Sequence, residues 1–350
     1  MILQEYGLAT FRTDTEIPRA GFAIGERIAA LDDLVRAYPS PSYERLAGKS
    51  VLDLLQDWDS ALEAVNNLRA AITETVIQDH FRAFSDVAIC PPVDLPRQVF
   101  CTGANYRKHV IDLTLDMGVG PEGLDAAGLR RWAENMMDER AATGEPYAFT
   151  KPVSTIGGAY DALVVPTIEE KPDWELELGV IIGRGGRNIS RADAMSHVAG
   201  YAIVNDVTSR SLIARTDYKQ LGTDWLRAKG QPGFLPFGPV LVPAQFVTDP
   251  YDLHLKLSLN GEVMQDEDAA DMIFDISRQI EYISRYTRLM PGDLICTGSP
   301  AGNGTHYNRF LQPGDLMVGE ITKLGRQAIR CVAAGAANPA TLQVQLLPAR

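Results

Sequence analysis

Hydrophobic and polar positions follow two different patterns in the two parts of this chain. Near the N-terminus, apolar residues recur every three or four positions, as on the buried face of a helix, in the stretches 28–39, 42–56 and 58–76. Residues 20–31 instead predict a β-hairpin that turns near Gly25-Glu26. A group of prolines between residues 91 and 96 indicates an irregular linker. We therefore expect a small N-terminal α/β domain over residues 1–95.

Beyond Gln98, short runs of β-branched residues alternate with glycine- and proline-rich turns. These runs occupy residues 99–103, 162–166, 176–183, 200–208, 239–243, 255–261, 293–298 and 315–321. Asn260-Gly261 predicts a hairpin turn, and residues 291–293 predict another tight turn. Because strands and helices do not alternate regularly, a doubly wound parallel sheet is not expected. The pattern favours an α+β fold, mainly β, for a second domain over residues 96–350.

One segment within this β-rich part, residues 121–143, has a helical and strongly charged pattern. It lies between two of the motifs described below, so we expect a lid over a site or an oligomer contact. The surrounding region 113–150 contains several large apolar side chains: Trp132, Met136, Met137, Tyr147 and Phe149. These side chains would either line a pocket for a bulky ligand or pack the helix against its neighbours.

Composition and charge narrow the class of protein. The 350 residues are 45% hydrophobic and 22% charged, as in a globular protein with a sizeable core. The formal net charge of -12 argues against nucleic-acid binding, which requires a basic face. No apolar run approaches the roughly 20 residues of a transmembrane helix, and residues 1–5 lack the pattern of a signal peptide. The cysteines match no zinc-ligand spacing and are too few for a disulfide scaffold: Cys90, Cys101, Cys296 and Cys331. We expect a cytoplasmic protein with free thiols and with neither membrane nor nucleic-acid partners.

Three acidic residues stand out within apolar strands. Glu175 and Glu177 are two positions apart, so a strand places both carboxylates on one face. Such a face could be solvated, but the apolar run that follows suggests burial, and buried like charges need a compensating cation. Asp206 ends a second apolar strand, where it either caps a following helix or supplies a third ligand. Because oxygen ligands favour a hard ion, Glu175, Glu177 and Asp206 are candidate ligands of Mg²⁺ or Mn²⁺.

A candidate acid–base pair precedes the charged helix. His109 and Asp112 are three positions apart, which makes them neighbours on a helical turn. The carboxylate would orient the imidazole and raise its basicity, as a general base requires. A single histidine on a helix is more often a surface or core residue, so this motif carries little weight by itself.

Two lysines and a glycine-rich loop are candidates for binding an anion. Lys229 precedes a run rich in glycine, proline and phenylalanine, and would provide a fixed positive charge for a carboxylate or oxyanion. Lys151 is a second candidate for the same role. For either lysine, a solvated position on the surface is the more common outcome. The glycines of the loop Thr297–Gly304 would allow backbone N–H groups to approach an anion. The loop lacks the lysine of a nucleotide-binding P-loop.

Together these motifs resemble those of the fumarylacetoacetate hydrolase family. The family pattern has six short motifs in a fixed order, and this chain matches them at Gly103–His109, Lys151-Pro152, Glu175–Leu178, Gly200–Arg210, Lys229-Gly230 and Pro291–Gly302. The matching region extends over roughly residues 98–335. The N-terminal segment is similar to the family's variable leading domain only in its position.

The resemblance implies a catalytic domain of the β-sandwich roll type, usually a homodimer, with Mg²⁺ or Mn²⁺ held by Glu175, Glu177 and Asp206. Many members hydrolyse a C–C bond of a 2,4-dioxo acid (an acylpyruvate) to pyruvate and a carboxylic acid, here in catabolism of aromatic or sugar-derived acids. The implied catalytic residues are His109, Asp112 and Lys229, and the implied substrate-binding residues are Lys151, Tyr106, Arg210 and Thr297. In this mechanism the histidine and its carboxylate activate water, and the lysine stabilises the oxyanion.

The chain also departs from the family pattern. Asp112 stands where the family leads one to expect Glu, and Ile213 stands where many members have Gln. The segment 113–150 is longer than in compact members, which indicates a different lid and a different substrate. Other activities therefore stay open: decarboxylation or tautomerisation of a 2-oxo acid, a lyase or dehydratase reaction on a sugar-derived acid, and a non-catalytic metal-binding homologue.

Overall fold

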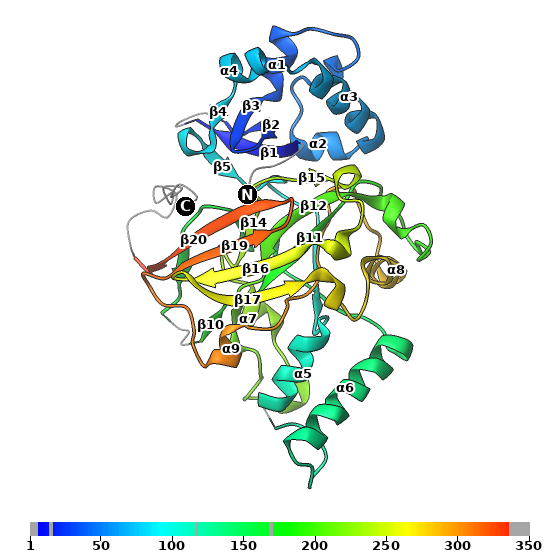
Figure 1. Ribbon diagram of the computed structural model, residues 1–350, viewed down its shortest axis with the longest axis vertical. Helices are drawn as coiled ribbons and strands as arrows, with labels where there is room; N and C mark the ends of the chain where they lie inside the picture. The colour runs from blue at the N-terminus through cyan, green and yellow to red at the C-terminus, as the bar shows by residue number, and fades with distance from the viewer. Residues whose placement is uncertain (1–5, 14–16, 117, 168–170, 336–350) are drawn as a thin grey trace.

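The computed structural model describes residues 6–13, 17–116, 118–167 and 171–335 (Figure 1). The expectation about a signal peptide rests on residues 1–5 and lies outside these ranges. Among the described helices, none is both long and apolar enough to cross a membrane. All four cysteines are free thiols, as expected.

The N-terminal part of the chain forms a lobe with its own antiparallel sheet at one end of the molecule's long axis (Figure 1). In spatial order the strands are β4 (Arg82–Ala83), β3 (Arg27–Ala30), β2 (Arg19–Ile24), β1 (Gly7–Arg12) and β5 (Ala88–Cys90). The helices packed on it are α1 (Leu31–Ala37), α2 (Val51–Leu55), α3 (Trp58–Ala71) and α4 (Glu74–His80). β2 and β3 form the predicted hairpin, which turns at Gly25-Glu26.

Caps, rather than apolar spacing alone, determine where these helices begin. The predicted stretch 42–56 is interrupted at Gly48, whose φ of +68° lies in the left-handed region. α2 begins after Ser50, which forms a capping box with Asp53. Likewise the stretch 58–76 is divided by Thr73, whose side chain caps α4. The boundary near residue 95 stays a prediction, because the core beneath these helices continues into the following strands, at Val99, Val204 and Leu294 for example.

Two larger sheets and a short strand pair form the body of the molecule. The first sheet contains β7 (Tyr147–Thr150), β6 (Val99–Gly103), β18 (Leu294–Cys296), β11 (Leu176–Ile182), β12 (Val198–Asn205), β14 (Leu235–Phe237) and β8 (Ile156–Gly158), with β15 (Val242–Pro243) paired to β12. The second contains β17 (Glu262–Asp268), β16 (His254–Leu259), β19 (Leu316–Ile321), β20 (Gly325–Ala333) and β9 (Leu163–Val165). β10 (Pro172–Asp173) and β13 (Thr208–Ser209) form the short pair.

The two larger sheets share one apolar core. Leu176 and Leu178 on β11 belong to the same buried cluster as Leu255 and Leu257 on β16. The approach is close enough that a Cβ at Gly319 on β19 would lie 2.6 Å from Leu176 Cδ1. The α+β, mainly β architecture predicted from the sequence is therefore confirmed, including the hairpin turn at Asn260-Gly261 between β16 and β17.

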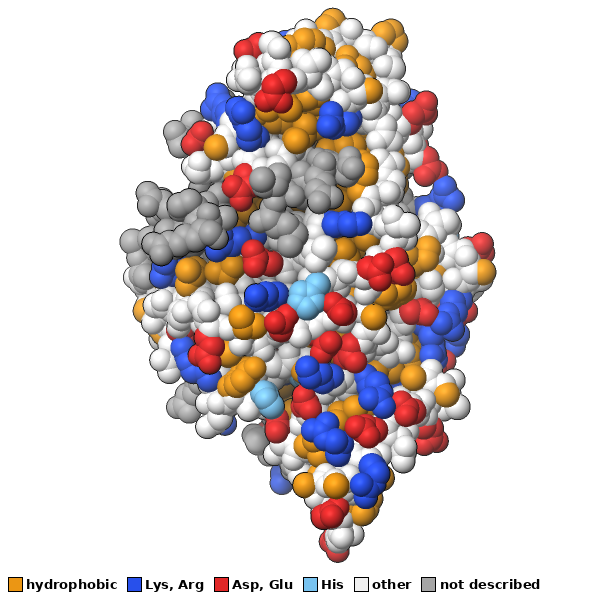
Figure 2. Space-filling view, in the orientation of Figure 1, with side chains coloured by type: hydrophobic (Ala, Val, Ile, Leu, Met, Phe, Trp, Pro, Cys, Tyr) orange, Lys and Arg blue, Asp and Glu red, His pale blue; other side chains and the backbone are white. Residues whose placement is uncertain are grey.

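A pair of helices, α5 (Arg107–Asp116) and α6 (Ala126–Thr143), lies at the end of the molecule opposite the N-terminal lobe (Figure 1). α6 begins later than predicted because Asp125 caps it. The pair has a small core of its own, to which Trp132, Met136 and Met137 contribute. These side chains therefore pack the two helices together. Acidic and basic side chains are interspersed over the face shown in Figure 2, including this helical end.

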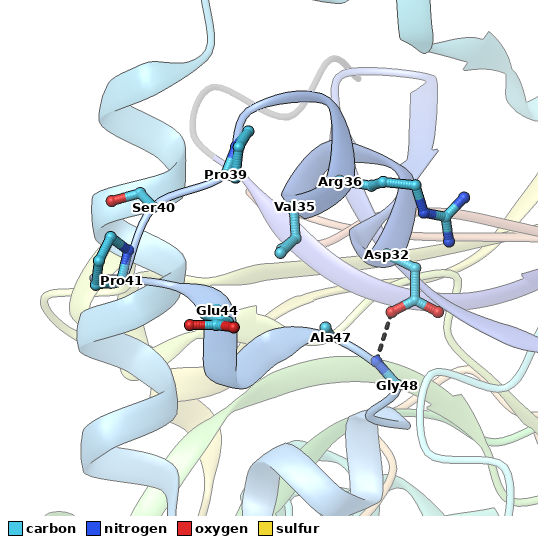
Figure 3. Close-up of a pocket in the computed structure, with 9 residues that line it drawn as sticks. All are labelled: Asp32, Val35, Arg36, Pro39, Ser40, Pro41, Glu44, Ala47 and Gly48. Atoms are coloured by element: carbon cyan, nitrogen blue, oxygen red, sulfur yellow. Dashed lines mark hydrogen bonds between the residues drawn. The ribbon is translucent and has the colours of Figure 1, made fainter.

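Three short or medium helices complete the body: α7 (Trp225–Lys229), α8 (Ile276–Tyr286) and α9 (Gly304–Tyr307). A pocket of about 700 Å³ lies in the N-terminal lobe, beside α1 and the loop that follows it (Figure 3). Its lining residues are Asp32, Val35, Arg36, Pro39, Ser40, Pro41, Glu44, Ala47 and Gly48. None of the sequence motifs contributes to this pocket, so the candidate site lies elsewhere.

Candidate metal centre

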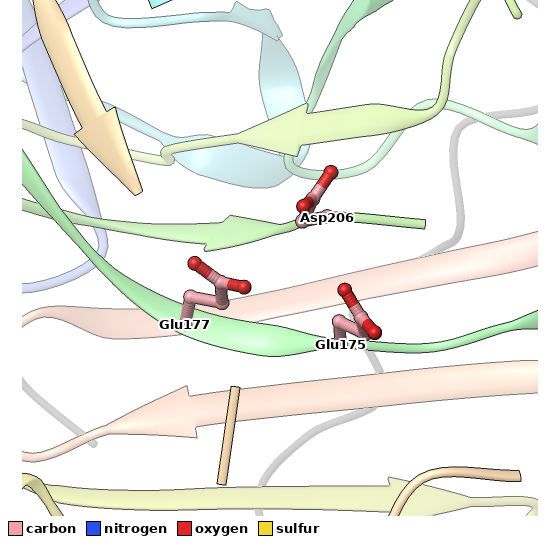
Figure 4. Close-up of side chains that lie close together, drawn as sticks. All are labelled: Glu175, Glu177 and Asp206. Carbon is pink, nitrogen blue, oxygen red and sulfur yellow. The ribbon is translucent and has the colours of Figure 1, made fainter. Parts of the chain in front are cut away.

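The three acids predicted from the sequence lie together where two adjacent strands meet, at the start of β11 and the end of β12 (Figure 4). Glu177 lies on β11 and Glu175 immediately precedes that strand, while Asp206 directly follows β12. One carboxylate oxygen from each residue lies within 4.8 Å of the other two, and all three residues are buried. The structure thus brings together the three side chains that the sequence nominated as metal ligands.

Strand geometry places these carboxylates. Leu176 and Leu178 enter the core between the two sheets, so the alternate residues Glu175 and Glu177 face the opposite side of β11. Asn205 ties the start of β11 to the end of β12: its Oδ1 accepts a hydrogen bond from the backbone N–H of Glu175 at 2.9 Å. The backbone N–H of Asp206 donates to the carbonyl oxygen of Glu175 at 2.8 Å. The cluster therefore stands on a hydrogen-bonded strand pair.

Two buried lysines lie against the acids. Lys229 Nζ lies 2.7 Å from Glu175 Oε2, 2.5 Å from Asp206 Oδ2 and 2.7 Å from Thr208 Oγ1. Lys151 Nζ lies 2.5 Å from Asp206 Oδ1 and also donates to two backbone carbonyl oxygens. Both lysines are buried and are therefore not solvated surface residues. They supply positive charge to the acid cluster.

An arginine and a further buried acid extend the cluster. Arg210 Nη2 lies 2.6 Å from Glu175 Oε1, and its Nε lies 2.8 Å from Asp173 Oδ2. Arg210 was expected to contact substrate, whereas here its guanidinium bridges two carboxylates. Asp173 was not among the predicted site residues. The spacing of the acids could have identified it, because Asp173, Glu175 and Glu177 are each two residues apart and so share one side of an extended chain.

The glycine-rich loop after β18 approaches the same cluster. The backbone N–H of Gly298 donates to Glu177 Oε2 at 2.8 Å. Gly298 has a φ of +104°, and a Cβ there would lie 2.8 Å from the Cβ of Asn105, so this approach requires glycine. Thr297, expected to bind substrate, donates its hydroxyl to the carbonyl oxygen of Leu178 at 2.9 Å. The anion that this loop contacts in the structure is thus the Glu177 carboxylate.

The structure places His109 and Asp112, the expected acid–base pair, on the same helix. Both lie on α5, yet within the described residues no hydrogen bond joins them, and Asp112 Oδ1 instead lies 3.9 Å from Arg130 Nη2 on α6. The pKa of His109 is lowered to about 4, mainly by burial; the Glu175 carboxylate opposes this effect, and the positive charges of Arg210 and Lys229 add to it. A neutral imidazole close to the acid cluster is the result. The catalytic roles of His109 and Asp112 stay predictions.

Tyr106 differs from the other expected substrate-binding residues because its hydroxyl has no hydrogen-bond partner among the described residues. Its side chain is fully buried. Burial, and secondarily the Glu177 carboxylate, raise the pKa of the phenol, so the hydroxyl keeps its proton. A buried, unpaired donor beside the acid cluster is available to a ligand.

The electrostatics of the acids fit a divalent cation. Burial and the neighbouring Asp206 carboxylate raise the pKa of Glu177 well above its usual value. Burial would also raise the pKa of Glu175, but Lys229 and Arg210 outweigh burial and lower it. A cation beside Glu177 would relieve the repulsion that the lysines leave uncompensated. Each carboxylate oxygen has two lone pairs, so the observed hydrogen bonds leave room for a metal ligand bond.

A half-exposed aromatic wall flanks Lys229. Phe149 on β7 and Trp225 on α7 stack with ring centroids 4.9 Å apart and an interplanar angle of 14°. Lys229 Nζ lies 5.4 Å from the centroid of Phe149 and 5.8 Å from that of Trp225. Trp225 Nε1 donates to the hydroxyl of Tyr147 at 2.7 Å. Of the apolar side chains in 113–150, Tyr147 and Phe149 therefore lie near the acids, unlike those that pack α5 on α6.

Fold and site together define a β-rich enzyme scaffold with a candidate divalent-metal centre. Residues 98–332 match the family described as fumarylacetoacetate (FAA) hydrolase C-terminal. The chain therefore belongs to the fumarylacetoacetate hydrolase family, as its ordered motifs indicated.

Individual relatives have several activities. Over 239 residues the chain is 43% identical to 2,4-didehydro-3-deoxy-L-rhamnonate hydrolase of Sphingomonas sp. (strain SKA58), covering 67% of this chain and 73% of the relative. Over 286 residues it is 32% identical to the mitochondrial oxaloacetate tautomerase FAHD2A of Bos taurus, covering 81% and 80%. A solved structure of maleylpyruvate hydrolase from Sphingobium sp. SYK-6, in complex with manganese(II) ion and pyruvate, is 25% identical. It matches with a TM-score of 0.66 over 93% of this chain and 99% of that one.

Proposed function

We propose that the protein is a metal-dependent hydrolase that cleaves a C–C bond of a 2,4-dioxo acid to give pyruvate and a carboxylic acid. The observation that carries the proposal is the buried cluster of Glu175, Glu177 and Asp206, bounded by a buried ammonium and a neutral imidazole. The 43% identical relative supports it, because its name denotes hydrolysis of a sugar acid with oxo groups at C2 and C4.

The three carboxylates would hold Mg²⁺ or Mn²⁺, which supplies Lewis-acid stabilisation of the negative charge on the 2-oxo acid end of the substrate. His109 is neutral at neutral pH and accepts the proton of the attacking water. The hydroxide adds to C4, the C3–C4 bond breaks, and its electron pair forms the enolate of pyruvate. Protonation at C3 then gives pyruvate, and the acyl group leaves as the carboxylic acid.

Lys229 stabilises the oxyanion at C4 in this proposal. An ammonium has three donors, and those of Lys229 are engaged by Glu175, Asp206 and Thr208. The lysine must therefore exchange one of these hydrogen bonds for the substrate. Tyr106, whose hydroxyl is unpaired, provides a donor for the substrate carboxylate. Lys151 and Arg210 act on the substrate through the acids that they contact, and Thr297 through the loop that it anchors.

The aromatic wall of Tyr147, Phe149 and Trp225 would bind the acyl group beyond C4. The ring centroids of Phe149 and Trp225 both lie within 6 Å of Lys229 Nζ. The wall is half exposed, so it borders the site without filling it. Aromatic faces bind apolar or flat groups and the C–H faces of sugars through dispersion.

One observation favours a second candidate, tautomerisation of an oxaloacetate-like 2-oxo acid at the same site. Asp112 faces Arg130 rather than His109, so the histidine lacks the carboxylate that would strengthen it as a base toward water. Moving a proton between C3 and the 2-oxo oxygen needs no activated water. The 32% identical oxaloacetate tautomerase shows that the family includes this activity.

A side-by-side assay separates the two candidates. The purified chain with Mn²⁺ is given acetylpyruvate in one reaction and the enol form of oxaloacetate in another, and the products are followed by NMR. Hydrolysis predicts equal amounts of acetate and pyruvate in the first reaction. Rapid enol–keto conversion of oxaloacetate without acetate formation in the first reaction would establish the tautomerase instead.

Quaternary structure and location are further proposals. We propose a homodimer with cytoplasmic location, a small 2-oxo or 2,4-dioxo acid as the ligand, and no nucleic-acid or membrane partner. The α5–α6 pair, which projects from the body (Figure 1), would serve as the lid or as the subunit contact. Analytical ultracentrifugation of the wild-type chain and of a variant with substitutions on the exposed face of Ala126–Thr143 tests whether α6 forms the subunit contact.

A further inference from the structure

Asp173 is a buried carboxylate that no sequence motif included and that the proposed reaction does not use. It accepts hydrogen bonds from two separate parts of the molecule. On one side, Arg210 Nε lies 2.8 Å from Oδ2. On the other, the backbone N–H of Gly304 lies 2.5 Å from Oδ1, and the backbone N–H and hydroxyl of Thr305 both lie 3.1 Å from Oδ2. Asp173 thus links the strand that precedes Glu175 to the start of α9.

The first link leads to a candidate metal ligand. The guanidinium of Arg210 contacts Asp173 through Nε and Glu175 through Nη2, at 2.8 and 2.6 Å. A guanidinium presents its donors in a rigid planar fork. Fixing the Nε donor of this fork on Asp173 therefore fixes the direction from which the Nη2 donor holds Glu175 Oε1.

The second link leads to the helix that carries His109. A side chain at position 304 would place a Cβ 2.7 Å from Asp173 Oδ1, so glycine is what lets the backbone N–H reach this carboxylate. From α9, His306 Nδ1 lies 2.8 Å from Asp116 Oδ2, at the last residue of α5. This outer contact is half exposed and therefore weaker than the buried links.

We propose that Asp173 is a positioning residue that holds Glu175 through Arg210 and, through α9, holds α5 and its histidine against the same site. The first half rests on the proposed metal centre, whereas the second half does not. The competing interpretation is that Asp173 only caps a surface loop. Its loss would then lower stability without changing the metal affinity or the mobility of α5 in the folded protein.

Variants of the whole chain separate the two links. Asp173→Asn removes the negative charge and leaves one oxygen that can accept a hydrogen bond. With that oxygen at the Oδ1 position, Gly304 keeps its acceptor, while Arg210 and Thr305, which share Oδ2, meet an N–H₂ instead. The variant therefore breaks the first link and weakens the second. Arg210→Lys breaks the first link from the other side. His306→Ala breaks only the outer contact with Asp116. Asp59→Asn is the matched control, because it removes an exposed ion pair with Arg184 far from the site.

Two readouts need no substrate: the Kd for Mn²⁺ measured by electron paramagnetic resonance, and hydrogen–deuterium exchange of Arg107–Asp116. We expect Asp173→Asn and Arg210→Lys each to weaken Mn²⁺ binding about tenfold or more, since groups that orient a metal ligand typically have effects of this size. The double variant should bind no more weakly than the weaker single variant, because both changes break one link. His306→Ala should leave the Kd unchanged and speed the exchange of α5 by about twofold to fivefold.

Unchanged Mn²⁺ affinity in Asp173→Asn and Arg210→Lys, or unchanged α5 exchange in His306→Ala, would overturn the corresponding half of the proposal. If Asp173→Asn does not fold, Arg210→Lys and His306→Ala still test the two links separately. A chain that shows this pattern but releases no pyruvate would retain the inference and refute the hydrolase function. A wild-type chain that binds no Mn²⁺ would overturn the first half together with the metal centre.

Discussion

The ammonium of Lys229 lies 2.5 Å from Oδ2 of Asp206, in a site where both side chains are almost fully buried. The same ammonium lies 2.7 Å from Glu175 Oε2, so one lysine joins two of the three candidate metal ligands. Asp206 and Glu175 raise the pKa of Lys229 against the opposing effect of burial, so it stays charged. The protein therefore carries part of the counter-charge for its acid cluster within its own chain.

Replacing this lysine should destabilise the metal-free protein. Lys229→Met keeps the length of the side chain but leaves Asp206 and Glu175 buried without their shared cation. Removing one partner of a buried ion pair typically costs about 3–5 kcal/mol in unfolding free energy. We expect a loss of this order in urea unfolding with EDTA, and partial recovery with Mn²⁺. Lys219→Met, at an exposed lysine, is the control. An unchanged unfolding free energy would show that the acids are not dependent on Lys229.

Glu177→Gln should have the opposite effect on the metal-free protein. The pKa of Glu177 is raised in the folded protein, so ionisation of this acid opposes folding. Below the unfolded pKa of about 4.3 the acid is protonated in both states and does not reduce the free energy of unfolding. As the pH rises above that value, the acid lowers the free energy of unfolding. We expect the glutamine variant to be more stable than wild type at pH 7 in urea unfolding with EDTA. The difference should shrink toward pH 4.5. Gln can still accept the hydrogen bond from Gly298, so a loss of stability at pH 7 would contradict this account.

His109 should titrate far below an ordinary histidine. Its folded pKa of about 4 lies below the ordinary histidine pKa of about 6.5, so the neutral form is favoured in the folded protein. The stability that this provides is complete above pH 6.5 and is lost as the pH falls toward 4. His254 is an internal contrast, because hydrogen bonds to Asp268 and Asp266 raise its pKa. In an NMR titration of the imidazole protons, with His109→Gln to assign the resonance of His109, we expect the midpoint of His109 to lie well below that of His254.

The same variant tests the role of the histidine in catalysis. General acid–base catalysis contributes about 10²- to 10⁴-fold, and we expect His109→Gln to lower kcat for pyruvate release by this factor at saturating Mn²⁺. Full activity in His109→Gln, with the NMR midpoint confirmed, would assign water activation to another group.

The aromatic wall should affect substrate affinity more than turnover. Trp225→Ala removes the ring that stacks on Phe149, and a lost aromatic contact of about 0.5–1.5 kcal/mol would raise KM about twofold to tenfold for a substrate with a bulky acyl group. Acetylpyruvate, with its small acyl group, should be affected less. Trp225→Phe should restore most of the affinity. Tyr286→Ala, at an exposed aromatic residue of α8, is the control. Equal effects on both substrates would show that the wall supports Lys229 rather than the acyl group.

The acid cluster could be predicted because its residues follow a local spacing pattern and occur in short motifs in a fixed order along the chain. Period-two spacing places Glu175 and Glu177 on one side of a strand, and an apolar strand ending at Asp206 suggests its partner. Asp173 follows the same period, but the sequence does not reveal that a backbone turn 131 residues later supplies its hydrogen-bond donors. Local periodicity therefore identified the acids and missed their support.

The predicted pair on α5 shows where local spacing is insufficient. His109 and Asp112 are neighbours on a helix, yet Asp112 pairs with Arg130, which α6 brings to it. The choice between the two partners depends on how the helices pack, which i, i+3 spacing cannot encode. Burial of Lys151 and Lys229 is likewise a tertiary property that the surrounding residues did not determine.

In the proposed function, the cluster of Glu175, Glu177 and Asp206 is a metal centre that serves C–C bond hydrolysis. The most direct measurement is the initial rate of pyruvate release from a 2,4-dioxo acid while Mn²⁺ is titrated into metal-free protein, in wild type and in Glu177→Gln. We predict that the wild-type rate rises from a negligible value and saturates once each chain has bound one ion, and that Glu177→Gln shows no rise. Pyruvate release at the same rate in EDTA, or an equal response to Mn²⁺ in Glu177→Gln, would contradict the claim.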